Sequence, residues 1–219
     1  MRNKKRTQEH RLKVTPLIAK TDNQRIYIRS IVDNDVTICI GPAGTGKSFV
    51  ASGLASEHLH RNKIEQIIVT RPLVCAGRDI GAMPGYMDEK IRPYLMPMEE
   101  NLKIFLGQAL YGSYFNKGKI RYEPLETMRG ATFHNAYMIL DEAQNCTLSQ
   151  IKMFITRMGE GSKVIINGDV RQTDISHTSG LQSCIDKLEG VAGTVTVVLD
   201  HSDIQRHAIV GAILAALEQ

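Results

Sequence analysis

The stretch Gly41-Pro42-Ala43-Gly44-Thr45-Gly46-Lys47-Ser48 has the pattern G-x-x-x-x-G-K-S and directly follows the apolar run 36–40. This placement predicts a strand that ends in a glycine-rich loop and continues as a helix. Glycines let backbone N–H groups close around a polyphosphate without Cβ clashes, and the helix points its positive N-terminal end at the same charge. In such a loop Lys47 reaches the β- and γ-phosphates, and the Ser48 hydroxyl ligates Mg²⁺. We therefore predict that residues 41–48 bind the phosphates of a nucleoside triphosphate.

Short apolar runs alternate with helical patterns along the rest of the chain. The runs are 36–40, 66–70, 137–141, 163–167 and 194–199, and the helical stretches are roughly 24–32, 47–61, 87–110, 148–158, 179–188 and 203–217. Such alternation is typical of a mainly parallel sheet with helices on both faces. We therefore predict one α/β domain over residues 21–219. The proline-interrupted stretch 71–133 is interpreted as an insertion at the carboxyl ends of the strands, where ligands bind in this architecture.

Two adjacent carboxylates, Asp141 and Glu142, follow the apolar residues 137–140. At the end of a buried strand beside a phosphate loop, one carboxylate can hold Mg²⁺ through its water shell, while the next orients and deprotonates the attacking water. We assign Asp141 to magnesium and Glu142 to the water. The alternative is that the pair caps the helix that begins near Thr147.

A third polar turn, Gly168-Asp169-Val170-Arg171-Gln172, follows the run 163–167. Because it is the third element in the order expected of a nucleotide site, we predict that Gln172 contacts the γ-phosphate or the attacking water. Its amide would then report whether ATP or ADP is bound. The alternative is an ordinary Gly-Asp turn.

The basic character of the chain lies at its N-terminus. Residues 1–13 contain six Lys or Arg and one Glu, a net charge of +5 that leaves the remainder at −1 within the total of +4. We interpret residues 1–20 as a flexible basic arm that either contacts nucleic-acid phosphates or is simply solvated. Four widely separated cysteines indicate neither a disulfide framework nor a zinc site, which favours a cytoplasmic location. No apolar run approaches the roughly 18 residues of a membrane span.

Several further motifs resemble the PhoH-like ATPases, whose core is similar to the first RecA-like lobe of superfamily 1 helicases. The resemblance extends over roughly residues 21–214. Besides the phosphate loop, the matching motifs are Asn23-Gln24-x-x-Tyr27, Thr70-Arg71-Pro72, Met83-Pro84-Gly85, Glu89-Lys90-Ile91-Arg92-Pro93-Tyr94, Met128-Arg129-Gly130, Ile139-Leu140-Asp141-Glu142-Ala143-Gln144-Asn145, Thr156-Arg157-Met158-Gly159, Gly168-Asp169-x-x-Gln172 and Arg206-His207.

The resemblance implies roles for residues that the local pattern alone does not assign. Gln24 resembles the glutamine that reads adenine, and Tyr27, one helical turn later, would pack on the base; an ordinary amphipathic helix is the alternative. Arg71 resembles a residue that touches the nucleic-acid backbone, or else forms a local salt bridge. Arg129 is a candidate for phosphate or subunit contacts, with a structural ion pair as the alternative.

Arg206 resembles the arginine that stabilises charge on the transferring γ-phosphate. In two-lobed helicases a comparable arginine comes from the second lobe, for which this sequence has no room. The resemblance therefore implies a homo-oligomer, for example a ring, in which Arg206 acts on a neighbouring subunit. The alternatives are that Arg206 serves its own site or pairs with Asp203 on a helix surface.

The leading functional hypothesis is an ATPase that uses Mg²⁺ and is coupled to RNA or single-stranded DNA, as a helicase-like motor or switch. The alternative is a nucleotide-dependent protein-assembly switch that ignores nucleic acid. ATP is favoured over GTP because no Asn-Lys-x-Asp base reader is present. A small-molecule kinase is disfavoured because Glu142 beside Asp141 favours water as the acceptor.

Overall fold

A computed structural model describes residues 13–72, 87–172 and 179–205, and for residues 87–94 it describes the backbone only. Its α-helices are α2 (Asp22–Asp33), α3 (Lys47–His60), α4 (Met87–Asn116), α5 (Leu148–Ile155) and α6 (Gly180–Leu188). Its strands are β1 (Val36–Ile40), β2 (Gln66–Thr70), β3 (Ile120–Tyr122), β4 (Ala136–Leu140), β5 (Lys163–Gly168) and β6 (Thr194–Val198). Three short 3₁₀-helices are η2 (Leu125–Thr127), η3 (Ala143–Asn145) and η4 (His201–Asp203).

The six strands form one sheet in the order β3-β2-β4-β5-β1-β6, and every pairing is parallel. Strand β5 lies between β1, which leads into the phosphate loop, and β4, which leads into Asp141. Because all strands run the same way, the polar turns after β1, β2, β4 and β5 lie at one edge of the sheet. The predicted mainly parallel α/β fold is confirmed.

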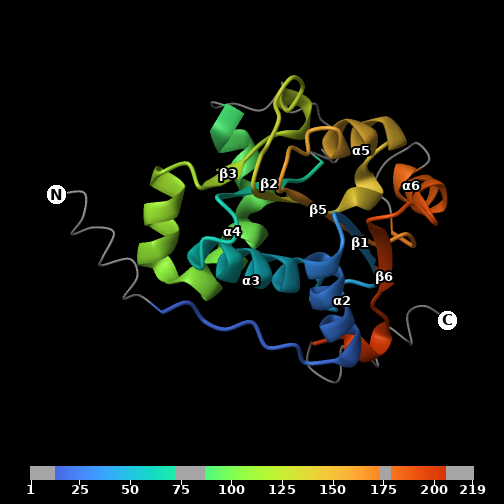
Figure 1. Ribbon diagram of the computed structural model, residues 1–219, viewed down its shortest axis with the longest axis horizontal. Helices are drawn as coiled ribbons and strands as arrows, with labels where there is room; N and C mark the ends of the chain where they lie inside the picture. Colours follow the sequence, from blue (N-terminus) through green and yellow to red (C-terminus); the bar gives the residue numbers. More distant parts are fainter. Residues whose placement is uncertain (1–12, 73–86, 173–178, 206–219) are drawn as a thin grey trace.

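Helices cover both faces of the sheet, and alternate strand residues supply the two cores (Figure 1). One core packs α2, α3 and α4 against Ile67, Ile139 and Ile165, while the other packs α5 and α6 against Ile68, Met138 and Ile166. The central strands β4 and β5 are buried on both faces. This double burial explains why residues 136–140 and 164–166 are uninterrupted apolar segments in the sequence.

Side-chain caps fix the start of two helices close to the site. Thr21 accepts a hydrogen bond from the backbone N–H of Gln24 and so begins α2. Thr147 and Gln150 form a reciprocal capping box that begins α5. The cap of α5 is therefore Thr147, and the predicted alternative in which Asp141 and Glu142 cap this helix is wrong.

The stretch 71–133 contains more regular structure than predicted. Helix α4 continues to Asn116 past a break in helical geometry at Gly107, where φ is 69°. It leads to β3, a strand absent from the prediction, which pairs with β2 at the edge of the sheet. Strand β3 has only three residues, one of them Arg121, so it lacks the apolar run that identified the other strands.

The two ends of the described chain also differ from the predictions. Residues 13–20, part of the predicted flexible arm, are fixed to the helical layer: Thr15 N donates to Phe105 O (2.8 Å) and Leu17 N to Glu57 Oε1 (2.8 Å). Residues 1–12 lie outside the described part of the chain. Asp203 belongs to η4 rather than to an α-helix, and the remainder of the predicted helix 203–217 lies outside the described residues from position 206 on.

Candidate nucleotide-binding site

The phosphate loop connects β1 to α3, as the sequence predicts. Its first residue, Gly41, has a φ of 153°, and a Cβ there would collide with the carbonyl oxygen of Leu199. Gly46, the residue before α3, has a φ of 90° and lies against the Gln24 amide. Both positions require glycine, because the backbone conformation and the close neighbours leave no room for a side chain.

Lys47 folds back over the loop. Its Nζ donates to the carbonyl oxygens of Gly41 (2.6 Å) and Pro42 (2.9 Å). These bonds hold the ammonium group against the first two residues of the loop. A phosphate in the loop would therefore meet both the lysine charge and the backbone N–H groups.

Ser48 and Asp141, which are predicted to share a magnesium ion, are in direct contact. Ser48 Oγ donates to Asp141 Oδ1 at 2.6 Å, although the two residues are 93 positions apart. Burial raises the pKa of Asp141 above its usual range, while the hydrogen bond from Ser48 acts in the opposite direction. The carboxylate is thus desolvated and close to the phosphate loop, an environment in which a cation would stabilise its charge.

Glu142 follows Asp141 and is restrained on both carboxylate oxygens. Gln144 Nε2 donates to Oε2 at 2.5 Å, and Arg71 Nη2 lies 3.4 Å from Oε1. The backbone of Glu142 is left-handed, with φ 55° and ψ 41°. A non-glycine residue in this region is uncommon and often marks a functional site.

The predicted third element lies next to this pair. Asp169 donates its backbone N–H to Gln144 Oε1 at 3.1 Å, so Gln144 connects the turns after β4 and β5. Gln172 donates its backbone N–H to Asp169 O at 3.1 Å, and its side chain is exposed. Gln144 was not singled out as a site residue in the sequence, although it stands two positions after Glu142 in the same motif.

Gln24 of α2 contacts the backbone of the phosphate loop, but Tyr27 does not fit its predicted role. The Gln24 side chain is 3% exposed and donates from Nε2 to Thr45 O at 3.0 Å. Tyr27 is fully buried, and its hydroxyl donates to Asn167 Oδ1 at 2.6 Å. The prediction that Tyr27 packs on the base is therefore wrong for this conformation, because its ring belongs to the core and has no exposed face.

Residues 200–205 form a corner that joins the loop to α2, a connection that sequence reasoning did not identify. The buried carboxylate of Asp203 accepts hydrogen bonds from Thr21 Oγ1 (2.5 Å), Asn23 Nδ2 (2.9 Å) and Asp200 N (2.8 Å). Gln205 N then donates to Gly44 O at 3.0 Å. Asp203 is thus buried in η4 rather than exposed on a helix surface, and Arg206 lies outside the described residues.

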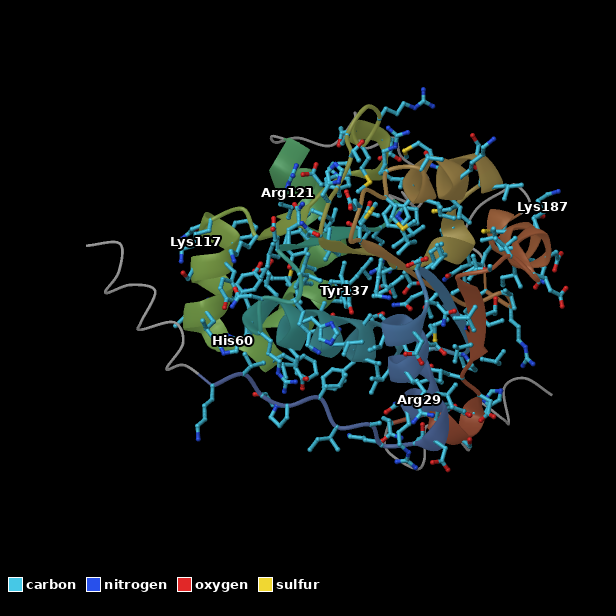
Figure 2. The ribbon with its side chains drawn as sticks, in the orientation of Figure 1. Arg29, His60, Lys117, Arg121, Tyr137 and Lys187 are labelled. Atoms are coloured by element: carbon cyan, nitrogen blue, oxygen red, sulfur yellow. The ribbon has the colours of Figure 1, made fainter. Side chains whose placement is uncertain are left out.

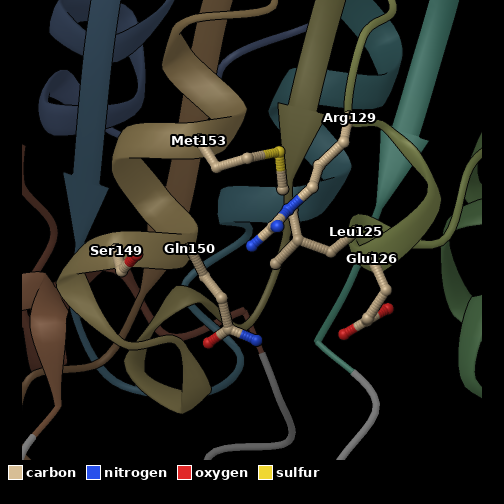
Figure 3. A pocket seen from close by; sticks show the side chains of 6 residues that line it. All are labelled: Leu125, Glu126, Arg129, Ser149, Gln150 and Met153. Carbon is tan, nitrogen blue, oxygen red and sulfur yellow. The ribbon is translucent and has the colours of Figure 1, made fainter.

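Arg129 lies apart from the phosphate loop. It is exposed, and together with Leu125, Glu126, Ser149, Gln150 and Met153 it lines a hollow of about 300 Å³ between η2 and α5. Figure 3 shows the Arg129 side chain extending into this hollow from the loop after η2. The ion pair considered as the alternative for Arg129 is not found among the described residues.

Other side chains of the described chain form no second site of comparable chemistry. Tyr137 lies between the sheet and α3, where its hydroxyl is 2.7 Å from His58 Nδ1 (Figure 2). Cys39, Cys146 and Cys184 are free and buried. In the ranges 13–72, 87–172 and 179–205, no three His, Cys, Asp or Glu residues form a metal-binding group. None of the helices described has the length and apolar character to cross a membrane.

The sequence matches the family described as PhoH-like protein over residues 16–218. The chain belongs to the PhoH-like family. Two relatives named PhoH-like protein, from Synechocystis sp. and Bacillus subtilis, are each 44% identical, over 203 and 202 residues; these segments cover 92% and 91% of this chain and 62% and 63% of the relatives. Protein PhoH of Escherichia coli is 39% identical over 180 residues, which cover 80% of this chain and 51% of that protein. The chain thus spans between half and two thirds of the length of these relatives.

Solved structures share its fold at low sequence identity. The large terminase of bacteriophage HK97 is similar with a TM-score of 0.54 and 16% identity, covering 86% of this chain and 42% of the terminase. The UvsW helicase of bacteriophage T4 is similar with a TM-score of 0.51 and 14% identity, covering 91% of this chain and 67% of the helicase. The fold of this PhoH-like chain is therefore the RecA-like P-loop domain that the sequence predicts.

Proposed function

We propose that this PhoH-like chain binds ATP with Mg²⁺ and hydrolyses it, and that RNA or single-stranded DNA stimulates the turnover. The observation that carries the proposal is the contact between Ser48 of the phosphate loop and Asp141 after β4, with Glu142 next in the chain. A magnesium ligand on the loop, a carboxylate beside it and a second carboxylate for the water are the parts that hydrolysis of a nucleoside triphosphate needs.

The donor set fits magnesium. Mg²⁺ prefers oxygen ligands, keeps several waters and is usually held by one or two carboxylates together with substrate phosphates. Ser48 Oγ and Asp141 Oδ1 are such oxygens, and a bound ion would replace the hydrogen bond between them.

The other predicted site residues act on the phosphates, the attacking water or the adenine. Lys47 moves from the loop carbonyls to the β- and γ-phosphates, and Glu142 orients and deprotonates the attacking water. Gln172, exposed beyond β5, reaches toward the γ-phosphate. Gln24 acts on the adenine side through its contact with the loop. Arg206 completes the site from a neighbouring subunit of a homo-oligomer, so activity should fall on dilution to monomers.

Two arginines are proposed to contact nucleic acid. Arg71 directly follows β2 at the carboxyl edge of the sheet, and its side chain is 25% exposed. Arg129 extends into the hollow between η2 and α5, where polar and apolar side chains stand together. Aromatic residues make up only 5% of the sequence and tryptophan is absent, so affinity should come from phosphate contacts rather than from base stacking.

Steady-state ATP hydrolysis tests the proposal, with the wild type and Glu142→Gln each assayed with and without single-stranded RNA and DNA. Loss of a general base should lower turnover by a factor of about 10² to 10⁴. Glu189→Gln, an exposed change at the end of α6, is the matched control and should retain wild-type turnover.

Three results would contradict parts of the proposal. Unchanged turnover in Glu142→Gln would remove Glu142 from the mechanism. Turnover that persists when EDTA removes Mg²⁺ would refute the magnesium assignment. Turnover indifferent to both nucleic acids would leave an ATPase and favour the protein-assembly switch.

A further inference from the structure

Arg71 and Glu142 form an ion pair across two neighbouring strands. Arg71 directly follows β2, Glu142 follows β4 by two residues, and these strands are paired so that Thr70 lies beside Leu140. Arg71 Nη2 is 3.4 Å from Glu142 Oε1. The residue proposed to touch nucleic acid therefore contacts the residue proposed to activate water.

The second oxygen of Glu142 is also engaged. Gln144 Nε2 donates to Oε2 at 2.5 Å, while Gln144 Oε1 accepts from Asp169 N at 3.1 Å. A general base must form a hydrogen bond with the water whose proton it removes. Each carboxylate oxygen of Glu142 therefore has one protein partner, Gln144 on Oε2 and Arg71 on Oε1, and together these two partners restrain the direction in which the partly exposed carboxylate faces.

The two contacts differ in how readily they can be broken. The bond from Gln144 is short, and Gln144 is buried and fixed to the turn after β5. The contact with Arg71 is longer than the 2.7–2.9 Å typical of a charge-assisted hydrogen bond, and both partners are partly exposed, Arg71 at 25% and Glu142 at 38%. Ion pairs of this kind are weak and open to competition from other anions.

We propose that Arg71 is a positioning residue that restrains Glu142, and that a nucleic-acid phosphate bound by Arg71 frees Glu142 to activate water. This inference rests on the proposed ATPase function and names how that function is regulated. A phosphate competes for the guanidinium because it offers a full charge and bidentate geometry. Once Arg71 turns to the phosphate, Oε1 of Glu142 is available to the attacking water, while Gln144 still holds Oε2.

The test compares ATP turnover of the wild type, Arg71→Gln and Arg71→Lys, each without and with saturating single-stranded RNA. Arg71→Gln should hydrolyse ATP about fivefold faster than the wild type without RNA, the factor expected from loss of a partly exposed ion pair. RNA should then stimulate it little. Arg71→Lys keeps the cation and should restore both the low basal rate and part of the stimulation.

Arg61→Gln is the matched control. Arg61 also pairs with a glutamate, Glu57 at 3.7 Å, but it lies at the opposite end of α3 from the phosphate loop. Its basal turnover and its RNA stimulation should equal those of the wild type.

The outcomes separate this inference from the proposed function. If the wild type hydrolyses ATP through Glu142 and responds to RNA, but Arg71→Gln has an unchanged or lower basal rate, Arg71 does not restrain Glu142 and the inference fails alone. The inference fails likewise if Arg71→Gln is stimulated as strongly as the wild type, because the signal then bypasses Arg71. A wild type without Glu142-dependent turnover, or without a response to RNA, overturns the proposed function and the inference with it.

Discussion

Replacing Asp203 with alanine should destabilise the corner that joins α2 to the phosphate loop. The side chain is 0% exposed and accepts three hydrogen bonds, from Thr21 Oγ1, Asn23 Nδ2 and Asp200 N, at 2.5, 2.9 and 2.8 Å. Asp203→Ala removes the acceptor of all three bonds at once and leaves three donors without their partner.

The size of the effect follows from these bonds. A hydrogen bond to a charged group contributes about 1.5–3 kcal/mol, and a donor left unsatisfied in the interior adds to the loss. Thr21 and Asn23 are only half-buried, so water can replace part of what they lose. At about 1 kcal/mol for each of the three bonds, the free energy of unfolding should fall by about 3 kcal/mol. For a chain of this length that corresponds to a decrease of about 6–12 °C in Tm.

Urea unfolding followed by far-ultraviolet circular dichroism, without nucleotide, measures this change. Asp186→Ala is the matched control, because the exposed Asp186 accepts one bond from Gln182, and it should change the free energy of unfolding by less than about 0.5 kcal/mol. Binding of ATP should weaken in Asp203→Ala, because Gln205 N holds Gly44 O of the loop. A loss of stability below about 1 kcal/mol would refute the reasoning, since water would then replace all three bonds.

Two further predictions concern the metal and the nucleic acid. Burial raises the pKa of Asp141, so without metal the wild-type free energy of unfolding should fall as the pH rises from the ordinary carboxyl pKa to the raised one. Asp141→Asn has no carboxyl to titrate, so its free energy of unfolding in urea at pH 7 should be higher than that of the wild type. Equal or lower stability would contradict the pKa argument. The variant should also lose Mg²⁺-dependent ATP binding in calorimetry. Arg129→Gln should reduce the slope of log K against log salt for single-stranded RNA by about 0.7, the value for one phosphate contact, in fluorescence anisotropy. The exposed Lys187→Gln on α6 should leave that slope unchanged, and an unchanged slope in Arg129→Gln would place Arg129 outside the interface.

The sequence predicts those strands whose burial produces a recognisable apolar pattern in their own residues. Strands β4 and β5 are covered on both faces, so each contains an uninterrupted apolar segment, 136–140 in β4 and 164–166 in β5, and the bounds of both strands were predicted to within one residue. Strand β3 lies at the edge of the sheet and has only three residues. Its extended structure depends on pairing with β2, because its own residues form no apolar pattern. Local pattern therefore predicts the centre of the sheet better than its edge.

The site residues likewise fall into those that a local motif predicts and those that only the fold brings together. The phosphate loop and the pair of carboxylates are each contiguous, so their chemistry is contained in the local sequence. Ser48 and Asp141 could be assigned to one ion because a known chemistry requires both. The contact of Arg71 with Glu142 and that of Asp203 with Thr21 join distant segments, and a single sequence holds no information on which polar residues meet.

Tyr27 shows why helical spacing misleads at such a site. Gln24 and Tyr27 lie one turn apart and therefore share a face of α2, which suggested that both meet the base. That face is the one packed on the sheet: Gln24 reaches Thr45 O, whereas Tyr27 is buried against Asn167. Two residues on one helix face point in the same direction, but how deeply each side chain is buried decides whether it can reach a ligand.

The contacts behind the phosphate loop form a connected set with a consequence for how nucleotide is sensed. Thr45 O is held by Gln24 and Gly44 O by Gln205, while Asp203 ties the turn before Gln205 to the start of the helix that carries Gln24. A nucleotide that changes the shape of the loop must therefore either preserve both carbonyl contacts or move residues 203–205 together with the start of α2. The predicted γ-phosphate arginine follows immediately at position 206, and one hydrogen bond, from Gln205 N to Gly44 O, joins the loop directly to the segment that leads to it. Occupancy of the loop and the position of that segment should thus change together.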